Sequence, residues 1–181
     1  MTAAAGRWLV RRARQAIAAR LGIAHPRLPP PDDLLRAPAA CFVTLTLEGQ
    51  LRGCIGTLSA DAPLCEAVVR YAERAAFDDP RFPPLSAREW PRLEVEVSVL
   101  LASTPLHAAS EAELLAQLRP GEHGLTIERG TRRATFLPQV WANLPQPADF
   151  LRQLKRKAGL ADEFPVADLD CAIYTVNCFA D

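Results

Sequence analysis

The stretch CFVTLTLEGQLRGCIGTL, residues 41–58, contains the strongest structural pattern in the chain. From Cys41 to Leu47, aliphatic residues alternate with Thr and Phe, and residues 48–50 supply a turn that contains glycine. A second extended run returns from Leu51 to Leu58. Alternation with a period of two on both sides of such a turn is typical of a β-hairpin. We therefore predict two antiparallel strands here.

The register of this hairpin decides which side chains share a face. A three-residue turn would put the apolar side chains of both strands on the core face. The opposite, polar face would then carry Arg52 across from Thr46 and Cys54 across from Thr44, with the arginine and the cysteine roughly 7 Å apart along the strand. An arginine is permanently charged, and a nearby cation lowers the pKa of a thiol. We therefore predict a site in which Arg52 activates Cys54 as a nucleophile or acid–base group.

Two glycines, Gly53 and Gly56, flank this cysteine in the sequence. Glycine weakens a strand, and its usual justification is a bulge or the close approach of a ligand or another backbone. Together with Thr44, these glycines would form the floor of a pocket. The alternative is a packing role for Cys54, because free cysteine is among the most buried residue types.

The regions around the hairpin predict further helices and strands. Apolar residues from Trp8 to Leu21 recur at helical spacing, and Gly22 can end this helix. The N-terminal segment has no acidic residue before Asp32, which is also a feature of transit peptides. An amphipathic helix that belongs to the domain is the better interpretation of this segment. The other predicted elements are a proline-rich loop (25–38), a helix capped by Asp61, a capping box at Ser86 and Glu89, a strand (93–99), a helix after Ser110, a second hairpin (125–128 with 132–137), helices near 138–141 and 148–158, and a last strand (171–179).

Hairpins flanked by helices predict the α+β class with a mainly antiparallel sheet. A chain of 181 residues fits a single domain, residues 1–181, with room for two lobes. Basic and acidic residues number 21 each, and a chain without net charge has no general field for nucleic acid. No apolar run is long enough to span a bilayer.

The cysteines and histidines predict neither a metal nor a cofactor. The five cysteines form no Cys-x-x-Cys pair, and the three histidines are scattered along the chain. An odd number of cysteines without metal-like spacing, in a chain without a secretory signal, favours reduced thiols and a cytoplasmic location.

Other residues outside the hairpin are weaker candidates for a site. His123 lies in a loop and could be the base of a Cys–His pair, although a loop histidine is more often solvated. Arg81 could bind an anion, or form an ion pair with one of the two aspartates before it. Glu96 could act as an acid or base, and Thr135 could donate a hydrogen bond at the edge of a cleft.

Several segments resemble the AMMECR domain family, which is called AmmeMemoRadiSam system protein A in bacteria. The resemblance begins at LRGCIGTL (51–58) and covers essentially the whole chain in the same order. The other matching segments are AAFDDPRFPPL (75–85), VEVSVL (95–100), HGL (123–125), TFLPQVW (135–141) and KAGL (157–160).

The resemblance implies a two-lobed α+β fold with the cysteine motif in a cleft between the lobes. It also implies two partners, a Memo-like protein and a radical S-adenosylmethionine (SAM) enzyme. Our leading hypothesis is an enzyme that acts on a small anionic or carbonyl-bearing molecule through Cys54. The alternative is a binding or adaptor module for those partners, and a regulatory RNA-binding domain is disfavoured by the neutral charge.

Overall fold

The strand β1 (Cys41–Leu47) is an inner strand of a four-stranded sheet in the computed structural model, which describes residues 1–181. It pairs antiparallel with β2 (Gln50–Gly56) on one side and with β3 (Leu93–Leu100) on the other. The strand β8 (Val176–Ala180) follows β3, so that the order is β2-β1-β3-β8. This sheet belongs to the first of two compact units, residues 1–100 with 177–181, and β2 is one of its edge strands.

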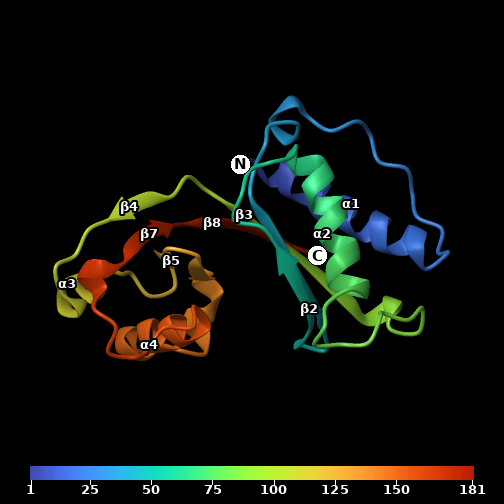
Figure 1. Ribbon diagram of the computed structural model, residues 1–181. Helices are drawn as coiled ribbons and strands as arrows, with labels where there is room; N and C mark the ends of the chain where they lie inside the picture. The colour runs from blue at the N-terminus through green and yellow to red at the C-terminus, as the bar shows by residue number, and fades with distance from the viewer. The chain divides into compact units, whose positions relative to one another are not determined.

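Two helices, α1 (Ala3–Arg20) and α2 (Leu64–Phe77), cover one face of this sheet (Figure 1). Val43 and Leu45 of β1 point into the same fully buried core as Ile17 of α1 and Val68 of α2. Because successive side chains of a strand point to opposite faces, the residues of β1 that alternate with Val43 and Leu45 point away from the helices. Thr44 therefore lies on the other face, together with the residues that pair with it.

The strand β2 passes very close to α2 at Gly53. A Cβ atom at this position would lie 2.1 Å from the carbonyl oxygen of Ala75, and one at Gly56 would lie 2.3 Å from the carbonyl oxygen of Cys41. Real Cβ atoms do not approach backbone this closely, so only glycine fits at either position. At both glycines, the predicted close approach is made by another segment of the backbone. The need for glycine at these positions is therefore explained without a ligand.

The second unit, residues 101–176, contains a four-stranded sheet of its own in the order β4-β7-β5-β6. Its pairs are antiparallel, and its core gathers around Phe150, Leu151 and Leu154. Trp141 stacks on Phe150 with the ring centroids 3.8 Å apart. The elements are β4 (Thr104–Leu106), α3 (Glu111–Gln117), β5 (Gly124–Arg129), β6 (Arg132–Phe136), α4 (Pro147–Lys157) and β7 (Asp170–Tyr174). Short 3-10 turns occur at Asp33–Leu35, Trp90–Arg92, Pro138–Ala142 and Val166–Asp168.

The predicted α+β class is confirmed, but several details differ from the prediction. The strands form two sheets, and the strand expected over 171–179 is interrupted at Thr175, so that its halves join different sheets. Asp61 does not cap α2, because the residue before the helix is Pro63 and no side chain caps this end. None of the helices combines the length and apolar character that crossing a bilayer requires.

Replacing Gly53 by alanine tests the close approach of β2 to α2. We expect Gly53→Ala to lower the free energy of unfolding by about 2–3 kcal/mol, because the methyl group forces two backbone segments apart. The measurement is urea unfolding followed by circular dichroism. The control is Gly22→Ala, where no atom lies within 4 Å and only the left-handed backbone (φ 70°) is disfavoured. That control should lose only about 1 kcal/mol, and equal losses in the two variants would contradict the close approach.

Candidate functional site

The turn of the first hairpin is one residue shorter than predicted, and this changes the place of Arg52. Glu48 and Gly49 have φ angles of 52° and 76°, which both belong to the left-handed region that two-residue hairpin turns use. Thr46 therefore pairs with Leu51, and Arg52 is the extra residue of a β-bulge. The predicted pairing of Arg52 with Thr46 is wrong.

Beyond the bulge the register returns to the predicted one. Cys54 pairs with Thr44, and Gly53 pairs with Leu45, as expected. The cysteine thus lies on the sheet face opposite the helices. This part of the prediction is confirmed because the apolar residues Val43 and Leu45 fix which face of β1 is buried.

The guanidinium of Arg52 is held by residues that follow α2. Its Nε donates to Oε1 of Glu89 at 2.7 Å, and its Nη2 donates to the carbonyl of Pro83 at 2.8 Å. Arg52 is 8% exposed, and its third nitrogen, Nη1, is buried without a hydrogen-bond partner. Its charge is therefore neutralised by Glu89. The structure does not support the prediction that Arg52 is the electrostatic partner of Cys54.

Glu89 is the acidic end of the predicted capping box. Its Oε2 accepts hydrogen bonds from the backbone N–H and the hydroxyl of Ser86, at 2.8 and 2.7 Å. The hydrogen bond from Arg52, followed by those from Ser86, lowers the pKa of Glu89 to about 2. The arginine of the motif thus ties the bulge of β2 to the segment after α2.

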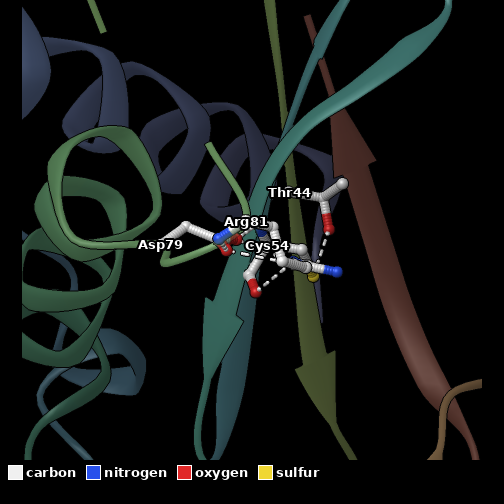
Figure 2. Close-up of polar contacts among 4 residues, drawn as sticks. All are labelled: Thr44, Cys54, Asp79 and Arg81. Carbon is white, nitrogen blue, oxygen red and sulfur yellow. Dashed lines mark hydrogen bonds and ion pairs between the residues drawn. The ribbon is translucent and has the colours of Figure 1, made fainter. Parts of the chain in front are cut away.

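Asp79 occupies the open edge of β2 beside Cys54 (Figure 2). An edge strand exposes unpaired N–H and C=O groups. The N–H of Cys54 donates to Oδ2 of Asp79 at 2.9 Å, and the carbonyl of Cys54 accepts from Nη2 of Arg81 at 3.2 Å. A carboxylate and a guanidinium therefore take the place of a neighbouring strand.

Asp79 and Arg81 also hold each other in a two-pronged ion pair. Nε of Arg81 donates to Oδ1 of Asp79 at 2.9 Å, Nη2 donates to Oδ2 at 2.7 Å, and the backbone N–H of Arg81 donates to Oδ1 at 3.1 Å. These bonds, first of all those from the guanidinium, hold the pKa of Asp79 well below its usual range. Of the two predicted roles of Arg81, the structure shows the ion pair. Its side chain is still 53% exposed, so its outer surface remains accessible.

The sulfur of Cys54 lies 3.2 Å from the hydroxyl oxygen of Thr44, its partner across the strands. Burial raises the pKa of the thiol above its ordinary value of 9.0, and the charges of Asp79 and Glu96 add to this effect. The hydrogen bond with Thr44 and the charge of Arg81 act in the opposite direction without reversing it. The thiol is therefore protonated at neutral pH, and the predicted net lowering of its pKa is not found.

Glu96 extends this pair into a row across three strands. Thr44 pairs with Cys54 of β2 on one side and with Glu96 of β3 on the other. Residues paired directly across antiparallel strands point to the same face. Ser98 donates to Oε1 of Glu96 at 3.1 Å. A thiol, a hydroxyl and a carboxylate thus follow one another on the face away from the helices, with Arg81 at the outer edge.

His123 and Thr135 belong to the second unit and take part in hydrogen bonds within it. Nδ1 of the buried His123 accepts from the backbone N–H of Arg119 at 3.3 Å. The hydroxyl of Thr135 donates to the carbonyl of Leu125 at 3.0 Å, and its oxygen lies 2.7 Å from the hydroxyl oxygen of Tyr174. The catalytic role of His123 and the binding role of Thr135 stay predictions.

The sequence did not single out Asp79 as a site residue. The sequence indicates Asp79 only as a possible ion-pair partner of Arg81, whereas its carboxylate also binds the backbone of Cys54. The sequence carries no signal for this contact, because it joins residues 25 positions apart. In the structure, Asp79 is only 4% exposed, and a carboxylate so buried requires the several donors that surround it. No group of three or more His, Cys, Asp or Glu residues is arranged to hold a metal ion.

These features define a class of α+β protein in which an edge strand presents a partly buried thiol. Within this class, the family model described as AMMECR1 matches residues 10–179. The chain therefore belongs to the AMMECR1 family.

Relatives of known sequence or structure resemble most of the chain. A protein of Methanothermobacter thermautotrophicus is 43% identical over 158 residues, which are 86% of this chain and 82% of the relative. A protein of Thermofilum pendens is 38% identical over 176 residues, 90% of this chain and 83% of the relative. The crystal structure of an uncharacterised protein from Pyrococcus horikoshii superposes with a TM-score of 0.90 at 33% identity, and the match covers 100% of this chain and 93% of that one.

Replacing Asp79 by asparagine tests the edge contact and its pH dependence. We expect Asp79→Asn to lower the free energy of unfolding at pH 7 by about 2 kcal/mol, because charge-assisted hydrogen bonds to buried groups are lost. The pKa of Asp79 is lowered from 3.8 on folding, so its stabilising contribution is complete above about pH 4 and is lost as the pH falls through the folded value. The difference between wild type and variant should therefore be constant near neutral pH and shrink in acid.

The matched control is Asp33→Asn, since Asp33 is fully exposed and its ion pair with Arg36 is 3.5 Å long. This variant should unfold like the wild type at every pH. Urea titrations between pH 2 and pH 8 provide the measurement. A loss in Asp79→Asn that stayed constant down to pH 2 would contradict the assignment of the stability to the ionised carboxylate.

Proposed function

We propose that this chain is a cytoplasmic, cysteine-dependent enzyme that acts on a small anionic or carbonyl-bearing molecule. The single observation behind the proposal is the row formed by Cys54, Thr44 and Glu96, with Arg81 at the end next to the cysteine. A nucleophile, a hydroxyl group, a carboxylate and a half-exposed cation are the kinds of group that addition to a carbonyl group uses. In this proposal the enzyme acts in concert with a Memo-like protein and a radical SAM enzyme.

The protonated state of Cys54 determines how such a reaction would begin. Because the thiolate and not the thiol is the nucleophile, the proton must leave as the substrate binds. Thr44 is in contact with the sulfur, and the nearby Glu96 raises the pKa of the thiol by its charge. We assign Glu96 as the proton acceptor, with the hydroxyl of Thr44 as the relay.

The addition step requires only the substrate and the residues of this row. The sulfur–hydrogen bond of Cys54 breaks, its proton passes to Glu96, and a sulfur–carbon bond forms as the carbonyl π electrons move to oxygen. Arg81 is placed to hold an anionic group of the substrate, because its side chain is 53% exposed although Asp79 fixes its position. Arg52, which is paired with Glu89, supports the strand in this proposal without touching the substrate.

The second candidate function is a non-catalytic adaptor for the Memo-like protein and the radical SAM enzyme. The raised pKa of Cys54 favours this alternative, because a protonated and partly buried thiol behaves like a small apolar group. In that case the sheet face that carries Thr44, Cys54 and Glu96 would be a contact surface.

Replacing Cys54 by serine separates the two functions. The purified chain, together with its Memo-like and radical SAM partners, is incubated with a metabolite extract of its source cells, and mass spectrometry records consumed metabolites and intact protein mass. We expect the wild type to consume an anionic or carbonyl compound and to form a transient adduct on Cys54, whereas Cys54→Ser does neither and still binds both partners. The lost thiolate should reduce turnover at least about 100-fold.

The control is Cys65→Ser, which makes the same atomic change at a half-buried cysteine of α2, in the same unit but outside the row. It should behave as the wild type does. If Cys54→Ser folds normally but no longer binds either partner, and if no metabolite is consumed by the wild type, the adaptor function replaces the enzymatic one.

A further inference from the structure

A cavity of about 390 Å³ lies in the first unit, apart from the row of Cys54, Thr44 and Glu96. It is lined by α1, by the proline-rich segment at 27–31 and by the first turn of α2. Both helices pack on the sheet face that is opposite Cys54. The proposed enzymatic function therefore uses none of the residues that line this cavity.

The walls of the cavity are fixed by hydrogen bonds between α1 and the proline-rich segment. The indole nitrogen of Trp8 donates to the carbonyl of Pro29 at 3.0 Å, and the side-chain amide of Gln15 donates to the carbonyl of Pro26 at 3.2 Å. Consecutive prolines at 29–31 further restrict the backbone of this wall. Preformed walls reduce the ordering cost of binding a ligand.

The lining combines apolar surface with positive charge. Trp8, Leu28 and the prolines contribute flat or aliphatic surface, whereas Arg12 and Arg27 contribute guanidinium groups. Arg12 is hydrogen-bonded to the neutral side chain of Gln15, at 2.6 Å, and neither arginine forms an ion pair. Glu66 is the one acidic residue of the lining, so the cavity carries a net positive charge.

The N-terminal part of the sequence, which supplies most of this lining, is strongly basic. Every formally charged side chain between residues 1 and 31 is an arginine, although the whole chain has no net charge. Among these arginines, Arg14 is neutralised by Asp181. The net positive charge of the lining attracts anions over a distance of about 10 Å at moderate salt.

We propose that this cavity binds a small organic anion with a carboxylate, sulfonate or phosphate head and a flat apolar body. Arg12 and Arg27 would bind the head by charge-assisted hydrogen bonds, and the body would lie against Trp8 and the proline segment. The volume falls within the range of about 300–1,000 Å³ that is usual for small-ligand pockets. A nucleic acid or an acidic protein would instead need a much larger contact surface.

The test uses 8-anilinonaphthalene-1-sulfonate, a fluorescent anion with this combination of groups, and the full chain. We expect saturable one-to-one binding that weakens about tenfold in Arg12→Gln and in Arg27→Gln, since each removes a charge-assisted hydrogen bond. The cysteine of the lining, Cys65, gives a second readout. Bound probe should slow alkylation of Cys65 by iodoacetamide without slowing that of the exposed Cys178.

The matched control is Arg11→Gln, which removes the same charge from an exposed position of α1 outside the lining. It should bind the probe as the wild type does and show the same protection of Cys65. Absence of saturable binding, or absence of Cys65 protection, overturns the proposal. Equal weakening in Arg11→Gln and Arg12→Gln also overturns it, because the arginines would then act as a diffuse basic surface suited to a polyanion.

Discussion

The carboxylate of Asp79 is the contact on which the arrangement around Cys54 depends. It accepts the N–H of Cys54, which the edge of the sheet would otherwise leave unpaired, and it holds the guanidinium of Arg81 through two further bonds. Arg81 in turn donates to the carbonyl of Cys54. One buried charge thus closes the edge of β2 and places a cation next to the cysteine. The sulfur itself lies on the sheet face opposite the helices, in contact with Thr44.

The two arginines near the cysteine have different functions because they have different partners: Arg52, the bulge residue of β2, pairs with Glu89, whereas Arg81 pairs with Asp79 beside Cys54. At the bulge Arg52 turns to Glu89 and the carbonyl of Pro83, and there it joins β2 to the segment that follows α2. Arg81 carries the charge that acts on Cys54. This charge does not outweigh burial, so the thiol stays protonated until a substrate or a base removes its proton. Glu96, two strands away on the same face, is the base that we assign to this step.

The sequence was sufficient for features that follow from local patterns. Alternating apolar residues in β1 and β3 determine their buried faces, so the pairing of Thr44 with Cys54 and the α+β class were predictable. The position of Arg52 was not predictable, because it depends on whether the hairpin turn has two residues or three. The edge contact of Asp79 joins residues 25 positions apart, and no periodicity reveals such a contact. The division of the strands into two sheets depends in the same way on non-local pairing.

The most direct test of this account is the pKa of Cys54, measured from its alkylation rate as a function of pH. We expect a wild-type pKa above 9.0 and a still higher pKa in Arg81→Gln, because burial opposes the thiolate and Arg81 favours it. Arg92→Gln, at an exposed arginine paired with Glu48, should leave the value unchanged. A wild-type pKa below 9.0, or the same pKa with and without Arg81, would contradict the arrangement described for Cys54.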